Sequence, residues 1–157
     1  SLELRQEVEE IQKAMASNDF EVLLHGDICP DNVYFQKSDM QIIDFEYGDV
    51  GHALIDGVYL RMSMPSCWCS KITPKDIVDQ MEAIYGNELK KKLFAANDEA
   101  HYNKALVYAC AFWAIRVINW HVDELMEREI ICPSGPVDRD SLWDPEKNAF
   151  RPRVLSR

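Results

Sequence analysis

The sequence predicts a mainly α-helical domain with a small β component, an α+β class, on three observations. Apolar residues recur at helical spacing near the N-terminus, and a long apolar helical pattern fills the second half of the chain. Between them, two short β-prone runs flank a polar turn, which is typical of a β-hairpin. The 157 residues, 47% of them hydrophobic, suffice for one core, so we expect a single domain over residues 1–157.

The N-terminal part of the chain predicts a helix and then a strand. Apolar residues at steps of four, three and four lie on one helical face, namely Leu4, Val8, Ile11 and Met15. We expect this helix to cover residues 2–15 and to end at Ser17-Asn18. The apolar run 22–24 then predicts a short buried strand.

The hairpin and the helices follow in order. Residues 33–35 and 41–43 are β-prone runs on either side of the turn 37–39. Thr73-Pro74 is typical of a helix start, and we expect that helix to run to Tyr85 and to stop at Gly86-Asn87.

The last predicted helix is the longest. Asn97 or Asp98 caps it, and it should run through about Arg128, with a middle that is apolar nearly all round and therefore central in the core. From Cys132 on, four prolines exclude a further long helix.

The charge excludes some classes of partner. Seventeen Lys and Arg against 27 Asp and Glu give a net charge of −10, which argues against nonspecific binding to nucleic acid or to an anionic membrane. The longest apolar run, 105–115, has 11 residues, whereas a membrane span needs about 20. The charge is compatible with a cationic substrate, although a solvated acidic surface is the simpler explanation.

Five cysteines and no secretory pattern at the N-terminus predict reduced thiols in a cytoplasmic protein. Cys67-Trp-Cys69 lacks the C-x-x-C spacing of zinc and redox sites, so we expect ordinary thiols there rather than a metal.

The chemistry is concentrated in residues 23–56. His25-Gly26-Asp27 is followed five residues after the aspartate by Asn32, and Asp44-Phe45-Glu46 comes after the hairpin. Phosphoryl transfer from a nucleotide needs a carboxylate to take the proton of the attacking hydroxyl and oxygen ligands to hold Mg²⁺ against the phosphates. Protein kinases place these groups in H-R-D-x-x-x-x-N and, across a hairpin, D-F-G. Singly, each Asp or Asn here is typical of a turn; together, at this spacing, they favour a catalytic site.

The segments HGDICPDN and IIDFEYG resemble the aminoglycoside phosphotransferase and choline kinase superfamily of small-molecule kinases. The resemblance covers about 34 residues. It implies a protein-kinase-like fold, of which this chain would be the helical C-terminal lobe with a small hairpin carrying the catalytic and metal motifs.

The resemblance implies roles for three residues. Asp27 matches the catalytic base, and Asn32 and Asp44 match the ligands of Mg²⁺, with ATP as the phosphoryl donor.

Four more residues match supporting positions of the family. His25 would brace the loop rather than act as a base, and Gly26 would permit a tight backbone. Glu46 replaces the glycine of D-F-G and would have a secondary role near metal or acceptor. Asp56 would hold the catalytic loop, although the chain has GHALID where the family has G-D-P-x-x-D.

The acceptor site is the least defined part of the prediction. In relatives it lies beside the long helix, and candidates at the end of that helix are Trp120, His121, Asp123 and Glu124. The aromatic residues of this helix fall at helical spacing, which is more typical of a core than of a ligand cage. Arg116 should be paired if it is buried, and Asp49 is a candidate partner.

The expected function is transfer of a phosphoryl group from ATP to a hydroxyl of a small molecule. Amino alcohols and aminoglycosides lead the candidates, and homoserine-, sugar- and thioribose-type acceptors stay open. Only about 20 residues precede the catalytic loop, and neither a Gly-rich loop nor a strand lysine appears. We therefore expect the nucleotide-binding lobe to lie outside this chain and the 157 residues alone to be inactive. The alternatives are a noncatalytic kinase-like binding or regulatory module and a metal-dependent phosphohydrolase.

Overall fold

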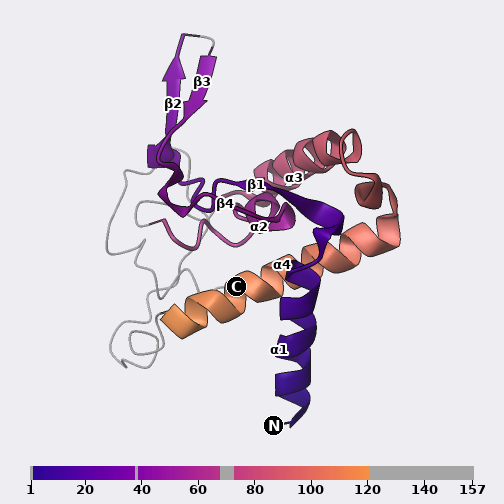
Figure 1. Cartoon of the computed structure of the whole chain (residues 1–157). Coiled ribbons are helices and arrows are strands. Elements are labelled where there is room, and N and C mark those ends of the chain that lie inside the picture. Colours follow the sequence, from indigo (N-terminus) through magenta and orange to yellow (C-terminus); the bar gives the residue numbers. More distant parts are fainter. Residues whose placement is uncertain (1, 38, 68–72, 121–157) are drawn as a thin grey trace.

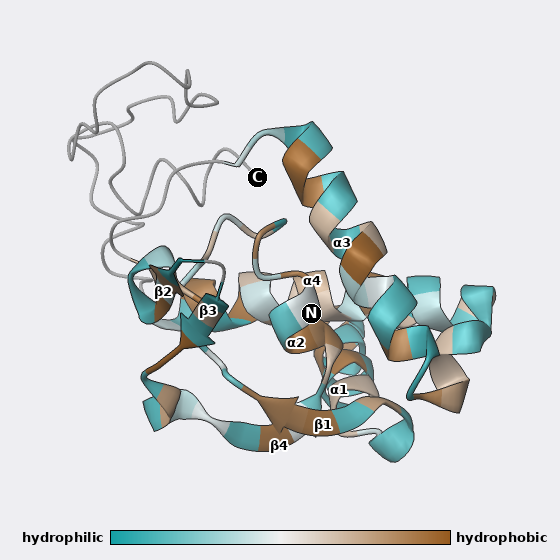
Figure 2. Ribbon diagram, turned by 90° about the horizontal axis from the view of Figure 1, so that it is seen from above, coloured by the Kyte–Doolittle hydropathy of each residue, from teal (hydrophilic) through white to brown (hydrophobic). Residues whose placement is uncertain are grey.

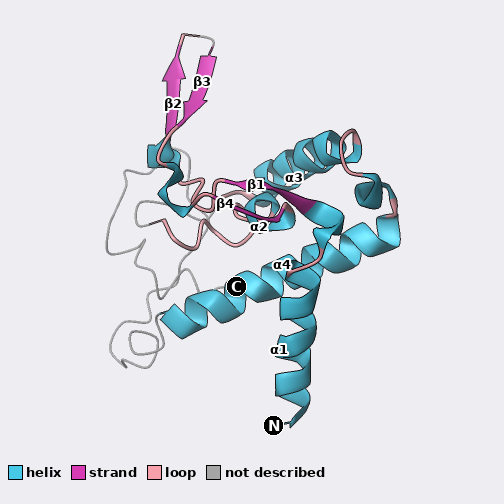
Figure 3. Cartoon of the chain, viewed as in Figure 1, coloured by secondary structure: helices cyan, strands magenta, loops and turns pink. Residues whose placement is uncertain are grey.

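A computed structural model describes residues 2–37, 39–67 and 73–120. In this part of the chain the elements are α1 (Leu2–Met15), β1 (Glu21–Leu24), β2 (Val33–Gln36), β3 (Asp39–Ile42), β4 (Asp49–His52), α2 (Leu54–Gly57), α3 (Lys75–Lys90) and α4 (Glu99–Trp120). Single 3₁₀ turns lie at 18–20, 30–32, 45–47 and 94–97. The predicted mainly helical α+β class is confirmed (Figure 3).

The described strands form two small antiparallel sheets. β1 pairs with β4, with Leu24 opposite Asp49 and Glu21 opposite His52. β2 pairs with β3 as the predicted hairpin, which projects away from the helical body (Figure 1). The β1–β4 pair therefore lies next to the loop that follows β1, whereas the β2–β3 hairpin forms a separate projection.

The core lies around α4, as its apolar sequence predicts. α1 packs across α4, and α2 lies between α4 and the strands (Figure 1). Trp113 on α4 is 1% exposed, and its indole Nε1 donates a hydrogen bond of 2.8 Å to the Ile55 carbonyl. This bond fixes the segment after β4 to the central helix.

The predicted end of α3 is wrong, because the helix continues through Gly86 to Lys90. A Cβ at Gly86 would lie 2.8 Å from the hydroxyl of Tyr102, so glycine here allows close packing of α3 on α4 instead of ending the helix. β4 was not predicted, since DVGH has no strand pattern. The expected end of α4 near Arg128 and the proline-rich tail lie outside the described residues.

Apolar side chains are exposed on the strands. Leu23 on β1 and Val50 on β4 are cross-strand partners, and both are more than half exposed. The hairpin exposes Tyr34, Phe35 and Met40 in the same way. Figure 2 shows this apolar character along β1 and β4. None of the helices in the described ranges has the length and apolarity needed to span a bilayer.

Candidate functional site

The pairing of β1 with β4 brings the two predicted motifs together. β1 ends at Leu24, directly before His25, and β4 begins at Asp49, just after the turn that follows Asp44. Because Leu24 is opposite Asp49, the loop that leaves β1 and the turn that enters β4 meet at one edge of the sheet.

His25 joins the two segments. It is 5% exposed, and its ring Nε2 lies 2.8 Å from the carbonyl oxygen of Ile43. Its Nδ1 accepts from the backbone N–H of Asp27 at 3.3 Å, which makes Nε2 the protonated nitrogen. Both ring nitrogens are engaged by backbone, so neither is placed to take a proton from a substrate. The position is that of a brace, as the resemblance implies.

Gly26 permits the closest approach in the site. Its φ is +82°, and a Cβ there would lie 2.6 Å from the carbonyl oxygen of Tyr47. Only glycine fits this left-handed position against the turn 45–47. The candidate catalytic loop is therefore packed directly on the segment that carries Asp44.

The Asp56 carboxylate binds the backbone of the loop at His25 and Gly26. Its Oδ2 accepts from the His25 N–H at 2.7 Å and its Oδ1 from the Gly26 N–H at 3.1 Å. Burial raises the pKa of Asp56, and the two backbone N–H donors act in the opposite direction.

His52 lies in this turn, at the position where the resemblance leads us to expect an aspartate. Burial lowers the pKa of His52 to about 4, so its ring is neutral at pH 7. Its Nδ1 accepts from the N–H of Leu54, the first residue of α2, at 3.2 Å. The turn thus keeps a local acceptor without the family's Asp and Pro.

Asn32 is oriented by Asp27. Its Nδ2 donates to the backbone carbonyl of Asp27 at 3.0 Å and approaches Asp27 Oδ2 at 3.4 Å. The backbone carbonyl of Asn32 accepts from Ile43 N–H at 3.0 Å. Since the amide nitrogen of this buried side chain faces Asp27, its amide oxygen is on the side of the amide group away from that nitrogen.

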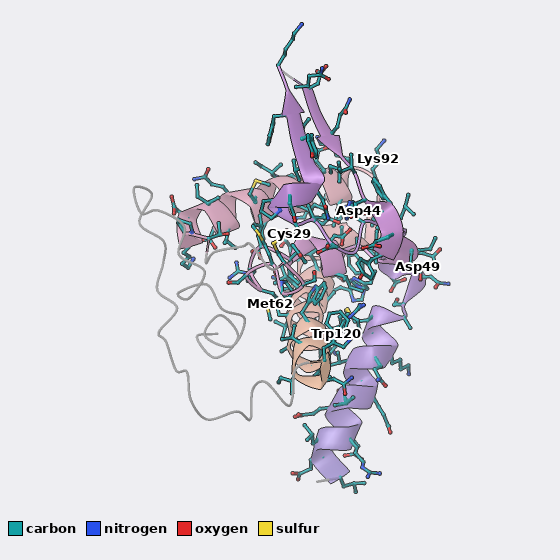
Figure 4. The ribbon with its side chains drawn as sticks, turned by 90° about the vertical axis from the view of Figure 1, so that its left-hand side faces the viewer. Cys29, Asp44, Asp49, Met62, Lys92 and Trp120 are labelled. Carbon is teal, nitrogen blue, oxygen red and sulfur yellow. A yellow bond between two sulfur atoms is a disulfide. The ribbon has the colours of Figure 1, made fainter. Side chains whose placement is uncertain are left out.

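Asp44 directly follows Ile43, so the same backbone bond sets it beside Asn32. Its backbone is left-handed, with φ of 65° and ψ of 61°, and its carboxylate is exposed. Figure 4 shows Asp44 at the base of the hairpin. No donor among the described residues contacts this carboxylate. Glu46, in the turn 45–47, is also exposed.

Two residues that the sequence did not predict touch the candidate base. The hydroxyls of Tyr59 and Ser66 each lie 2.7 Å from Asp27 Oδ1. They follow Asp27 by 32 and 39 residues in segments without any recognisable motif, so no sequence signal marks them.

The predicted acceptor residues are only partly within the described chain. Trp120, the last described residue of α4, is half exposed, and the Arg116 guanidinium lies 4.3 Å from its ring centroid. Arg116 stacks on aromatic rings and not on Asp49, so that expected pairing is wrong. Burial lowers the pKa of Arg116. His121, Asp123 and Glu124 lie outside the described residues.

Cys29, two residues after Asp27, forms a disulfide with Cys67. The expectation of reduced thiols is wrong for this pair, because residues 38 positions apart are brought together by the fold, which cysteine counting does not detect. Cys110 keeps its thiol. The exposed carboxylate of Asp31 lies near both sulfurs, but the disulfide leaves no thiolate there to bind a metal.

Loss of this crosslink should destabilise the protein. Cys67→Ser should lower the free energy of unfolding by about 2–4 kcal/mol, because the closed loop restricts the unfolded chain. Urea denaturation of the purified protein measures this, with Cys110→Ser as the control for thiol removal. Addition of a reductant should lower the free energy of unfolding of the wild type and leave that of Cys67→Ser unchanged. Alkylation of all five cysteines in the unfolded, unreduced protein would contradict the crosslink.

The chain matches the model of one protein family. The model of the phosphotransferase enzyme family matches residues 2–89, more than half of the chain, and this range contains both motifs and the residues that brace them. No curated protein matches the chain significantly. The chain therefore belongs to the phosphotransferase enzyme family.

Proposed function

We propose that this protein transfers the γ-phosphoryl group of ATP to a hydroxyl of a small molecule, with Mg²⁺ as the metal. The observation that carries the proposal is a pair of hydrogen bonds. The Asn32 side-chain amide donates to the Asp27 carbonyl, and the Asn32 carbonyl accepts from the N–H of Ile43, the residue before Asp44. This is the arrangement that in-line phosphoryl transfer needs, with a carboxylate for the acceptor proton beside oxygen ligands for the metal.

The side chains fit a magnesium ion. Mg²⁺ prefers oxygen ligands, and Asn32 offers an amide oxygen and Asp44 an exposed carboxylate. The metal, when bound, would neutralise charge on the β- and γ-phosphates. Asp27 would accept the proton of the acceptor hydroxyl through Oδ2, since Oδ1 already faces two hydroxyl groups. Glu46 would have a secondary role on the same side.

We further propose that the nucleotide-binding lobe is supplied from outside this chain. In the described ranges each sheet has two strands, too few for such a lobe. The exposed apolar side chains of β1, β4 and the hairpin support a covering partner lobe. We also propose a cytoplasmic location, because the proposed donor is ATP; the disulfide between Cys29 and Cys67 is unusual for that compartment.

We propose that the acceptor is an amino alcohol or an aminoglycoside-like amine. Homoserine, sugar and thioribose compounds are further candidates. A cavity of about 480 Å³ between residues 61–65 and α4 has room for a small molecule. Its wall includes Pro65, the neighbour of Ser66, which contacts Asp27.

An acceptor panel tests the proposal. The complete gene product and the 157-residue chain are each given Mg²⁺, radiolabelled ATP and one acceptor at a time. We expect labelled product from the complete gene product with at least one hydroxyl compound, and none from the chain alone. Robust transfer by the 157 residues would refute the separate lobe. ATP consumption without acceptor dependence would favour a phosphohydrolase, and neither transfer nor hydrolysis would favour a binding module.

A further inference from the structure

Three oxygen atoms form a compact triangle at the candidate base. Tyr59 Oη and Ser66 Oγ are each 2.7 Å from Asp27 Oδ1, and they are 2.8 Å from one another. The other carboxylate oxygen, Oδ2, has a much weaker neighbour in Asn32 Nδ2 at 3.4 Å. The two oxygens of one carboxylate are therefore in different surroundings.

We propose that Tyr59 and Ser66 are positioning residues, which fix Asp27 through Oδ1 and leave Oδ2 to take the acceptor proton. The inference rests on the proposed function, because that function makes Asp27 the base. It adds two residues to the site that lie outside both sequence motifs.

The number of protons available from the two hydroxyl groups supports the assignment. Each hydroxyl has one proton, and a carboxylate has none to give, so two protons serve three short oxygen pairs. With both protons donated to Oδ1, that atom accepts two hydrogen bonds and has no place for a third proton. Oδ2 is then the oxygen that receives the proton when the O–H bond of the acceptor breaks and its oxygen bonds to phosphorus.

The two hydroxyls are anchored in different ways. Tyr59 is 1% exposed, and its ring packs edge-on against Trp113, with ring centroids 5.7 Å apart. Ser66 is exposed, but its neighbour Cys67 is bonded to Cys29 in the catalytic loop. The hydrophobic core thus fixes one donor and the crosslink fixes the other, so Asp27 is held from two independent directions.

Removal of each hydroxyl tests the proposal in the complete gene product. Tyr59→Phe and Ser66→Ala should each lower kcat by roughly 10- to 100-fold, as expected for hydrogen bonds to a charged group. KM for ATP should stay nearly constant, because neither hydroxyl is placed at the metal ligands. Ser66→Thr, which keeps a hydroxyl, should retain most of the activity.

Tyr85→Phe is the matched control. The Tyr85 hydroxyl donates to the Ala53 carbonyl at 2.8 Å, in the same region but away from Asp27. This variant loses the same atom from a largely buried tyrosine and should keep kcat. An equal fall of kcat in Tyr85→Phe and Tyr59→Phe, or wild-type kcat in Tyr59→Phe, would overturn the positioning role.

Crystal structures of the variants test the proposal without any assay of activity. In Tyr59→Phe combined with Ser66→Ala, the Asp27 carboxylate should rotate or occupy more than one rotamer, whereas in Tyr85→Phe it should stay in place. An unchanged Asp27 rotamer in the double variant would refute the proposal. If the wild type phosphorylates no acceptor, the proposed function fails, and these structures still decide whether Tyr59 and Ser66 hold Asp27.

Discussion

Asp27→Asn should slow phosphoryl transfer by orders of magnitude while nucleotide binding is kept. The amide retains the size of the side chain and an oxygen for the hydroxyls of Tyr59 and Ser66, but it cannot accept the proton of the acceptor. A general base contributes roughly 10²- to 10⁴-fold to the rate, so kcat should fall by that amount.

The measurement is the steady-state rate with a saturating acceptor, together with the Kd of ATP by calorimetry. Asp31→Asn is the matched control, since it makes the same chemical change at an exposed position of the same loop. It should keep kcat. A fall of kcat by less than about tenfold in Asp27→Asn would show that Asp27 is not the base.

Asp44→Ala should abolish the part of nucleotide binding that depends on Mg²⁺. Its carboxylate is exposed and no donor among the described residues contacts it, so its negative charge is fully available to a cation. In the complete gene product, the affinity for ATP should no longer rise when Mg²⁺ is added. The affinity measured with a chelator should not change.

Asp49→Ala provides the control for loss of charge in the same segment. Asp49 is exposed and close in sequence, but its Oδ1 accepts from the adjacent Val50 N–H at 2.7 Å (Figure 4). Direct titration with Mn²⁺, followed by electron spin resonance, gives a second measurement that needs no turnover. Mn²⁺ binding of wild-type strength in Asp44→Ala would remove Asp44 from the metal site.

From the sequence alone, we could propose those candidate site residues that are close together along the chain. Asp27, Asn32 and Asp44 form a recognisable pattern because one loop and one hairpin connect them. The helices were predicted for the same reason, since the spacing of apolar residues reports directly on a helical face.

Tyr59, Ser66 and the disulfide were not predictable in this way, because distant segments meet only in the folded chain. The end of α3 at Gly86 was mispredicted for the same reason. Glycine is a common helix terminator, but here it makes room for the Tyr102 hydroxyl, and only the packing of two helices reveals that.

The backbone contacts of Ile43 affect which parts of the sequence can change during evolution. Its N–H bonds to the Asn32 carbonyl, and its own carbonyl lies against the His25 ring, so main-chain atoms align the two motifs. Main-chain bonds of this kind do not depend on the side chains between Asn32 and Ile43. The length and the surface residues of the projecting hairpin can therefore change in evolution, and the hairpin can gain new contacts, while the two motifs keep their relative positions.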